Sequence, residues 1–326
     1  MTADGDPPAF DEVVAVHRHS ATTVARVQFQ AQLFLLHGDD PAIRHRVVDL
    51  LAGYADANPE ITRFQRHMSN RLSPIPGKDV ATALHAEADR VDPTIDLYGP
   101  HVTDEEKLPR WHGAALMNAG NARDMDLSLL HLGMPAELPA LNPDDVVDRV
   151  IDWCRQAEPL HGMAGYALVG ELGMHRSYAA EIWPLLSRFS GLDHLGSYTM
   201  AARGVKKIQG VNWLTVLGAP MVDEIGGTER LRGLLDDAAE AFGVTGQNER
   251  PSLLPYDGGV VIRAGRLPQL GDRESDGVPV AYRVVYRALR PWVFVDYLNK
   301  PTRLLKVPAD VDAFGATLSW VTRFDA

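Results

Sequence analysis

The carboxylates around residue 274 have the spacing that comes closest to a chemical site. Asp272, Glu274 and Asp276 are separated by single residues and followed by Gly277, which matches positions 1, 3, 5 and 6 of a calcium-binding loop. Position 12 of such a loop is a glutamate that binds the ion through both oxygens, but this chain has Arg283 there. Because a cation replaces this ligand, the sequence favours a solvated acidic turn over a calcium site.

The histidines and the cysteine predict no catalytic or metal site. His17 and His19 lack a third ligand in register, and His161 and His175 do not form the HExxH pattern. Cys154 lies on the apolar stripe of a predicted helix, so we expect a buried hydrophobic residue rather than a thiolate nucleophile. As the only cysteine, it also excludes an internal disulfide. Since there is no Gly-x-Ser-x-Gly motif either, we predict no catalytic residue, no metal and no cofactor.

The glycine-containing segments do not match phosphate-binding loops. Gly77 and Lys78 are followed by Asp79 instead of serine or threonine, and the glycines of 170–173 lack the spacing of a dinucleotide fingerprint. The chain has 32 Lys and Arg residues against 43 Asp and Glu residues, a formal charge of −11. This charge repels nucleic-acid phosphates and complements a basic protein surface. We therefore predict no nucleic-acid partner and favour a basic protein partner.

The N-terminal residues predict neither export nor membrane insertion. Residues 1–12 contain four acids and no apolar run, unlike a signal or transit peptide. No stretch of the chain approaches the roughly 18–20 uninterrupted apolar residues of a membrane helix. We expect a cytoplasmic protein without a membrane partner, in which residues 1–20 are loosely ordered.

The elements that must position these residues alternate irregularly between strands and helices. Apolar spacing and chain-breaking residues predict strands at 24–36, 111–120, 125–134, 163–169, 211–217 and 259–264. Helices are predicted at 41–57, 79–90, 142–154, 178–189, 228–242 and 280–289, with Thr228 as the N-cap of its helix.

This order predicts an α+β fold. We expect a mixed, largely antiparallel sheet, or sheets, covered by amphipathic helices. The chain of 326 residues is long enough for one large domain or two ordinary ones. We predict a single domain over 21–326, and the proline-containing stretch 135–143 is the one boundary that would divide it into two α+β halves, 21–140 and 141–326.

Four segments in register resemble one protein family. They are 160–167, 188–193, 208–218 and 258–265, the last continued by 268–272 and 279–282. In this order they are similar to the TsiV-like family of type VI secretion immunity proteins, formerly a domain of unknown function, over residues 30–295. One departure is Ser190, where the family pattern has proline.

The resemblance implies a cytoplasmic antitoxin that binds a cognate secreted effector and blocks it. Nuclease effectors are among the toxins associated with this family. The shared segments are rich in glycine, tryptophan and apolar residues, so we expect them to encode the fold rather than partner choice, with Trp213 in the core. Gly191, Gly210, Gly218 and Gly265 are predicted to occupy turns that need positive φ. No functional residue is carried over from the family.

The sequence favours an immunity protein that occludes the working surface of its toxin without turnover. The missing catalytic constellation and the acidic charge both support this interpretation. One alternative is a small-molecule enzyme whose site is assembled from His161, Asp193, Asp272 and Tyr282. Another is an adaptor protein of an unrelated system.

The toxin-binding residues are predicted to lie outside the shared segments or at their edges. Two acidic stretches meet this condition: Asp104, Glu105 and Glu106, and the turn with Asp272, Glu274 and Asp276. Carboxylates at the rim of an interface steer association, whereas a buried carboxylate anchors the complex. Both stretches are therefore predicted contacts for a basic partner.

Overall fold

A computed structural model describes the chain in several ranges, and within them the strands form one large sheet. The described residues are 10, 13–65, 72–75, 80–90, 94–99, 108–117, 127–170, 178–194, 206–246, 249–295 and 307–325. Over these ranges the sheet has twelve strands, of which ten follow the order β11-β12-β10-β8-β2-β7-β6-β5-β3-β4.

The centre of the sheet is the long strand β2, Thr23–Leu35, which agrees with the strand predicted at 24–36. It pairs antiparallel with β7 (Ser128–Pro135) on one side and with β8 (His161–Gly170) on the other. Because β2 precedes residue 140 and β8 follows it, the two predicted halves share one hydrogen-bonded sheet.

The remaining strands extend the sheet on both sides. Beyond β7 lie β6 (Trp111–Leu116), β5 (Thr94–Gly99), β3 (Arg63–Gln65) and β4 (Leu72–Pro74). Beyond β8 lie β10 (Leu214–Gly218), β12 (Gly259–Arg263) and β11 (Ser252–Tyr256). Two short strands lie off this path: β1 (Val14–Val16) pairs antiparallel with β2, and β9 (Asp193–His194) pairs parallel with β8. The largely antiparallel sheet and its helices confirm the predicted α+β fold.

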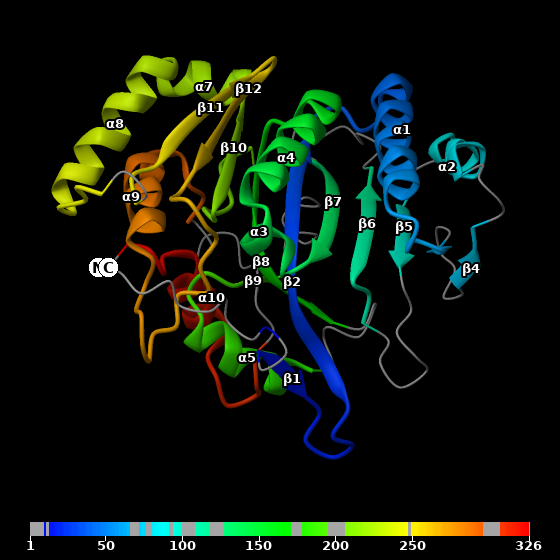
Figure 1. Ribbon diagram of the computed structural model, residues 1–326, viewed down its shortest axis with the longest axis horizontal. Coiled ribbons are helices and arrows are strands. Elements are labelled where there is room, and N and C mark those ends of the chain that lie inside the picture. The colour runs from blue at the N-terminus through cyan, green and yellow to red at the C-terminus, as the bar shows by residue number, and fades with distance from the viewer. Residues whose placement is uncertain are drawn as a thin grey trace.

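Helices cover the sheet and one of its ends. Figure 1 shows α1 (Pro41–Ala57), α2 (Val80–Ala88) and α4 (Pro143–Ala157) on the side that faces the viewer. At the β11 end lie α7 (Ala219–Ile225), α8 (Thr228–Ala241) and α9 (Val280–Leu289), which continues into the 3₁₀ turn Arg290–Trp292. The other helices are α3 (Leu138–Leu141), α5 (Ala179–Arg188) and α10 (Ala313–Val321).

Local sequence explains where the best predicted helices begin. The Asp40 side chain accepts a hydrogen bond from the Ala42 N–H, and Pro41 occupies the first turn of α1, where it has no bond to lose. Asp144 and Asp145 lie in the first turn of α4, where the helix dipole favours negative charge. The predicted cap of α8 is wrong: Thr228 is the first helical residue, and Gly227 precedes it without a capping side-chain bond.

The core runs along both sides of the central strands. Trp213, Tyr166 and Tyr282 are among the largest fully buried side chains, so the prediction that Trp213 is a core residue is confirmed. Cys154 is also fully buried, and burial raises the pKa of its thiol, which confirms its hydrophobic role. None of the helices in the described ranges is long and apolar enough to cross a membrane.

Candidate partner-binding site

The acidic turn at 272–277 is held to α5 by one arginine. Arg188 donates from Nε to Asp272 Oδ1 at 2.8 Å and from Nη2 to Asp272 Oδ2 at 2.6 Å, a bidentate ion pair. Its Nη1 also lies 3.3 Å from Glu274 Oε2. The hydrogen bonds from Arg188 lower the pKa of Asp272 to about 2. The Asp272 carboxylate is therefore ionised over the whole physiological range.

The individual carboxylates of this turn have different roles. Asp272 accepts from the Glu274 N–H at 3.0 Å, and its carbonyl accepts from the Gly277 N–H at 2.8 Å, so it organises the turn itself. Its side chain is only 14% exposed, whereas that of Glu274 is 70% exposed and Asp276 also lies at the surface. No group of three ligating side chains converges on a metal position anywhere in the described ranges. Glu274 and Asp276 are thus the carboxylates of this turn that a partner could reach.

The second acidic stretch, Asp104, Glu105 and Glu106, lies outside the described residues. The described chain resumes two residues later at Leu108, and Pro109 and Arg110 then lead into β6. These two residues line a pocket, which places one wall of the pocket close in sequence to the predicted contact stretch.

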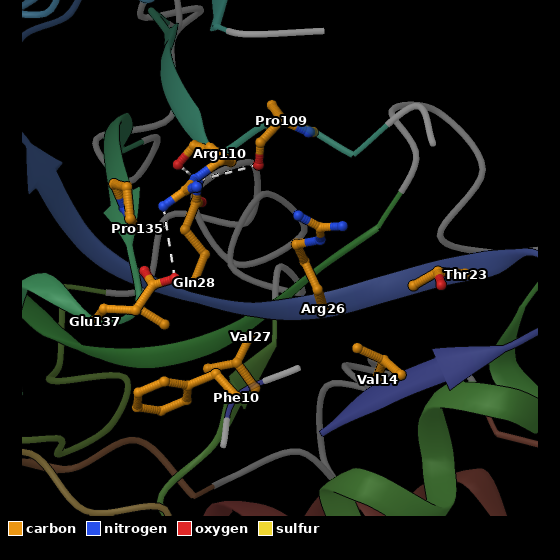
Figure 2. A pocket seen from close by; sticks show the side chains of 11 residues that line it. Phe10, Val14, Thr23, Arg26, Val27, Gln28, Pro109, Arg110, Pro135 and Glu137 are labelled. Carbon is orange, nitrogen blue, oxygen red and sulfur yellow. Dashed lines mark hydrogen bonds and ion pairs between the residues drawn. The ribbon is translucent and has the colours of Figure 1, made fainter. Parts of the chain in front are cut away.

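This pocket lies where β2 changes its neighbour (Figure 2). On one side of β2, Arg26 pairs with Val14 of β1, whereas Gln28 already pairs with Pro135 of β7. Val27 lies between the two partner strands, and a cavity of about 340 Å³ opens there. It is lined by Phe10, Val14, Thr23, Arg26, Val27, Gln28, Pro109, Arg110, Pro135, Ala136 and Glu137.

The pocket combines apolar walls with a few charged groups. Gln28 donates from Nε2 to the Arg110 carbonyl at 2.7 Å, and Gln30 donates to Gln28 Oε1 at 3.0 Å, which fixes the polar wall. Arg110 Nη2 lies 3.5 Å from Glu137 Oε1 in a half-exposed ion pair. The lining residues of the pocket include no histidine and no cysteine, and its carboxylate, Glu137, is paired with Arg110.

The residues of the alternative enzyme site do not meet in this pocket. His161 is buried at the start of β8, where its ring packs 4.7 Å from that of Phe34. The Tyr282 hydroxyl accepts a hydrogen bond from the Gln269 N–H at 2.9 Å, and burial raises its pKa. Asp193 is also buried, whereas Asp272 lies at the surface turn. None of the four lines the pocket.

The segments that carry the family resemblance meet instead in one buried, hydrogen-bonded cluster around Asn212 and Trp213, which we call the knot. Asn212 donates from Nδ2 to the Gly191 carbonyl at 3.3 Å and accepts at Oδ1 from the Trp213 N–H at 2.8 Å. A Cβ at Gly165 would overlap this Asn212 amide, so β8 needs glycine at that position. Trp213 donates from its indole nitrogen to the Gly265 carbonyl at 3.1 Å. The contacts between these segments therefore stabilise the fold.

The predicted glycines are needed in this knot more often because the backbone of another segment lies close to them than because their φ is positive. Of the four predicted positions, only Gly265 has positive φ, at 80°. A Cβ at Gly191 would overlap the Gln269 carbonyl oxygen, and one at Gly218 would overlap the Pro159 carbonyl oxygen. The positive-φ prediction is wrong for Gly191, Gly210 and Gly218, and for two of them the physical reason for glycine is lack of space.

A buried arginine joins the knot to the C-terminal helix. Arg323 donates from Nε to the Ser190 carbonyl at 2.7 Å and lies 4.0 Å from the centroid of the Trp320 ring. Burial lowers the pKa of Arg323 to about 10, and burial raises the pKa of nearby Asp193, while their mutual attraction opposes both shifts. Asp193 Oδ1 accepts from the His194 N–H at 2.7 Å.

Comparisons with known proteins identify the family of the chain. The model of the TsiV family, described as "Type VI immunity for VRR-NUC", matches residues 103–324. The match spans more than half of the chain and includes the whole knot, so the chain belongs to the TsiV family of type VI immunity proteins. This confirms the resemblance predicted from the sequence.

The fold is shared with a solved structure. The Pseudomonas aeruginosa T6SS protein PA0821 superposes with a TM-score of 0.74 at 21% sequence identity, over 93% of this chain and 85% of that chain. At this identity the similarity defines the fold alone. No curated protein matches the sequence significantly.

Proposed function

We propose that this protein is the inhibitor of a type VI effector of the VRR-NUC nuclease class, which it binds stoichiometrically and whose active surface it occludes. The family match over residues 103–324 carries this proposal. The site of action is the cytoplasm of the producing cell, where a nuclease would reach nucleic acid. The shared segments form the buried knot, which supports inhibition through a binding surface rather than through catalysis.

The distribution of charge supports a basic partner. Helices α4, α7 and α8 together carry ten carboxylates and four arginines. Six of these carboxylates are exposed and make no ion pair with any described residue: Asp145, Asp148, Asp223, Glu224, Asp237 and Glu240. A nuclease groove is cationic because it binds phosphates, so it is electrostatically complementary to such a surface.

Within this proposal, the two acidic stretches contact the effector. Asp104, Glu105 and Glu106 lie next in sequence to a pocket wall, and Glu274 and Asp276 project from a turn that Arg188 holds in place. Asp272 acts indirectly, because its carboxylate is already engaged by Arg188 and by the turn.

Binding and inhibition are tested together with the purified protein and the product of the neighbouring effector gene. We expect co-elution from size-exclusion chromatography and loss of nuclease activity that is complete at a fixed molar ratio. Protection at far below that ratio would indicate turnover and contradict stoichiometric inhibition. Failure to associate would remove the proposed partner.

A further inference from the structure

Two histidines on neighbouring helices face one another through the same ring nitrogen. His45 on α1 and His85 on α2 have their Nδ1 atoms 2.7 Å apart, with ring centroids at 4.9 Å. The other nitrogen of each ring faces a carboxylate: His85 Nε2 lies 2.9 Å from Asp49 Oδ1, and His45 Nε2 lies 3.3 Å from Asp89 Oδ1. The four side chains form one continuous chain between α1 and α2, which pack side by side (Figure 1).

The spacing of these residues makes the arrangement reciprocal. On each segment the aspartate follows its histidine by four residues: Asp49 lies within α1, and Asp89 lies directly after the end of α2. Each histidine contacts the aspartate of the other segment rather than its own. The contact therefore depends on both segments and acts between them.

Hydrogen bonding requires one proton, and only one, between the two Nδ1 atoms. An ionised carboxylate only accepts, so His85 Nε2, which bonds to Asp49 Oδ1 at 2.9 Å, carries a hydrogen. If both Nδ1 atoms were bare, their lone pairs would face each other at 2.7 Å, and if both were protonated, two N–H groups would collide. One proton between the Nδ1 atoms satisfies both rings.

We propose that His45 and His85 share one proton between their Nδ1 atoms, and that this shared proton makes the docking of α2 on α1 sensitive to acid. A metal ion does not fit the same gap, because two nitrogens on one zinc, at about 2.0–2.1 Å each in tetrahedral geometry, lie well over 3 Å apart. In acid, a second proton at this contact brings two N–H groups against each other, adds positive charge and separates the helices.

The other charged groups around the pair are engaged elsewhere. Arg44 donates to the carbonyls of Gly38 and Arg90, and Arg46 forms an ion pair with Glu158 at 2.6 Å. Glu87 and Arg90 form their own ion pair at 3.1 Å. Asp49 and Asp89 are therefore the charged groups, among the described residues, that contact the histidines directly. All four members of the chain precede residue 103, where the family match begins.

Amide hydrogen exchange of the whole protein at pH 7.5 and pH 5.0 tests this proposal. After correction for intrinsic exchange, we expect the α2 amides to lose protection about tenfold at pH 5.0, because the hydrogen bond between the two rings is lost. Helix α4 contains no histidine and serves as the internal control. His45→Gln and His85→Gln should each abolish this pH dependence, whereas His17→Gln, outside the two helices, should preserve it.

Nuclear magnetic resonance of the imidazole nitrogens provides a second readout that does not depend on helix docking. We expect His45→Gln to change the titration of His85, because the two rings share a proton. Independent titration of the rings, or α2 protection that is equal at both pH values, would overturn the proposal. A gain of protection on addition of equimolar Zn²⁺, reversed by EDTA, would assign the gap to a metal and would also overturn it.

Discussion

Asp193 is the last residue of the shared segment 188–193 and Asp272 pairs with its first residue, Arg188, yet the fold gives the two carboxylates opposite properties. Asp193 ends the segment 188–193 inside the knot, where burial raises its pKa and its Oδ2 has no hydrogen-bond partner among the described residues. Asp272 pairs with Arg188 at the beginning of that segment, and its pKa falls to about 2. The same residue type thus belongs to the scaffold in one region and to the surface in the other.

This contrast distinguishes residues that maintain the shared fold from residues that a partner can reach. In the knot, side-chain amides, an indole and a guanidinium are directed at backbone carbonyls of other segments, so a change there affects the fold. In the turn, Arg188 and Asp272 hold a frame from which Glu274 and Asp276 extend into solvent. Predictions for the two regions should therefore differ in size and in kind.

The largest effect is expected from Gly191→Ala in the knot. The new methyl group would overlap the Gln269 carbonyl oxygen, which is backbone and has no rotamer to change. We expect a loss of unfolding free energy of more than about 3 kcal/mol, in the range of severe packing and strain defects. Urea denaturation measures it. Gly233→Ala in α8 is the matched control, because nothing lies near its Cβ, and it should be neutral or stabilising.

A somewhat smaller loss is expected from Arg323→Met. This change keeps the apolar stem but removes the hydrogen bond to the Ser190 carbonyl and the positive charge near buried Asp193. Charged hydrogen bonds contribute about 1.5–3 kcal/mol, so the loss of unfolding free energy should lie in that range. Arg155→Met removes an exposed pair with Asp152 and should cost less than about 0.5 kcal/mol. Equal effects of the two substitutions would contradict the distinction between the regions.

The two aspartates should also give opposite pH dependences of stability. The pKa of Asp272 is lowered in the folded state, so its contribution is present above the unfolded-state pKa and disappears as the pH falls through about 2. The pKa of Asp193 is raised, so its contribution is present at low pH and disappears as the pH rises through the folded-state value.

Unfolding midpoints of Asp272→Asn and Asp193→Asn, measured from pH 2 to pH 7, check this prediction. Relative to the parent protein, Asp272→Asn should become less destabilising towards pH 2, and Asp193→Asn should become more favourable towards pH 7. If both substitutions shift stability in the same direction with pH, the contrast between the two sites is wrong.

The smallest effect on stability, but the clearest one on partner binding, is expected at the exposed carboxylates. Glu274→Lys with Asp276→Lys should change unfolding free energy by less than about 1 kcal/mol, because the pair of Glu274 with Arg188 is exposed and Asp276 lies at the surface. Association with the effector should slow, and the slowing should diminish at high salt if these residues steer encounter.

Reversal of Asp104, Glu105 and Glu106 tests the second stretch in the same way, and Asp56→Lys on α1 controls for the change in net charge. A faster dissociation rate would instead identify a buried anchor. If both reversed variants bind and protect like the parent, the contact surface lies on a less charged face.

Much of the secondary structure could be predicted because its signals are local. The helix at 280–289 has the predicted bounds, and the strand at 24–36 agrees to within one residue at each end, since periodic apolar spacing and chain-breaking residues mark both. The helix α7, the strand β11 and the helix α10 were not predicted. In β11 the exposure pattern does not alternate cleanly and Pro255 lies within the strand, so the sequence signal is weak without its partner β12.

The contacts that define candidate sites were less predictable. The pocket forms where β1 gives way to β7 beside β2, and it brings together residues separated by more than 100 positions. The repeated spacing of histidine and aspartate at 45–49 and 85–89 is visible in the sequence, but only the packing of α1 on α2 makes the two histidines face one another.

The α+β class, the family and the acidic character follow from the amino-acid sequence, because composition, periodic spacing and contiguous motifs do not depend on distant residues. Which polar residues are buried in the fold depends on tertiary contacts. Asp193 and Asp272 look equivalent in sequence, but their solvation and charge partners come from residues far along the chain, Arg323 for one and Arg188 for the other. Burial and ion pairing are properties of position in space, so chain order alone does not specify them.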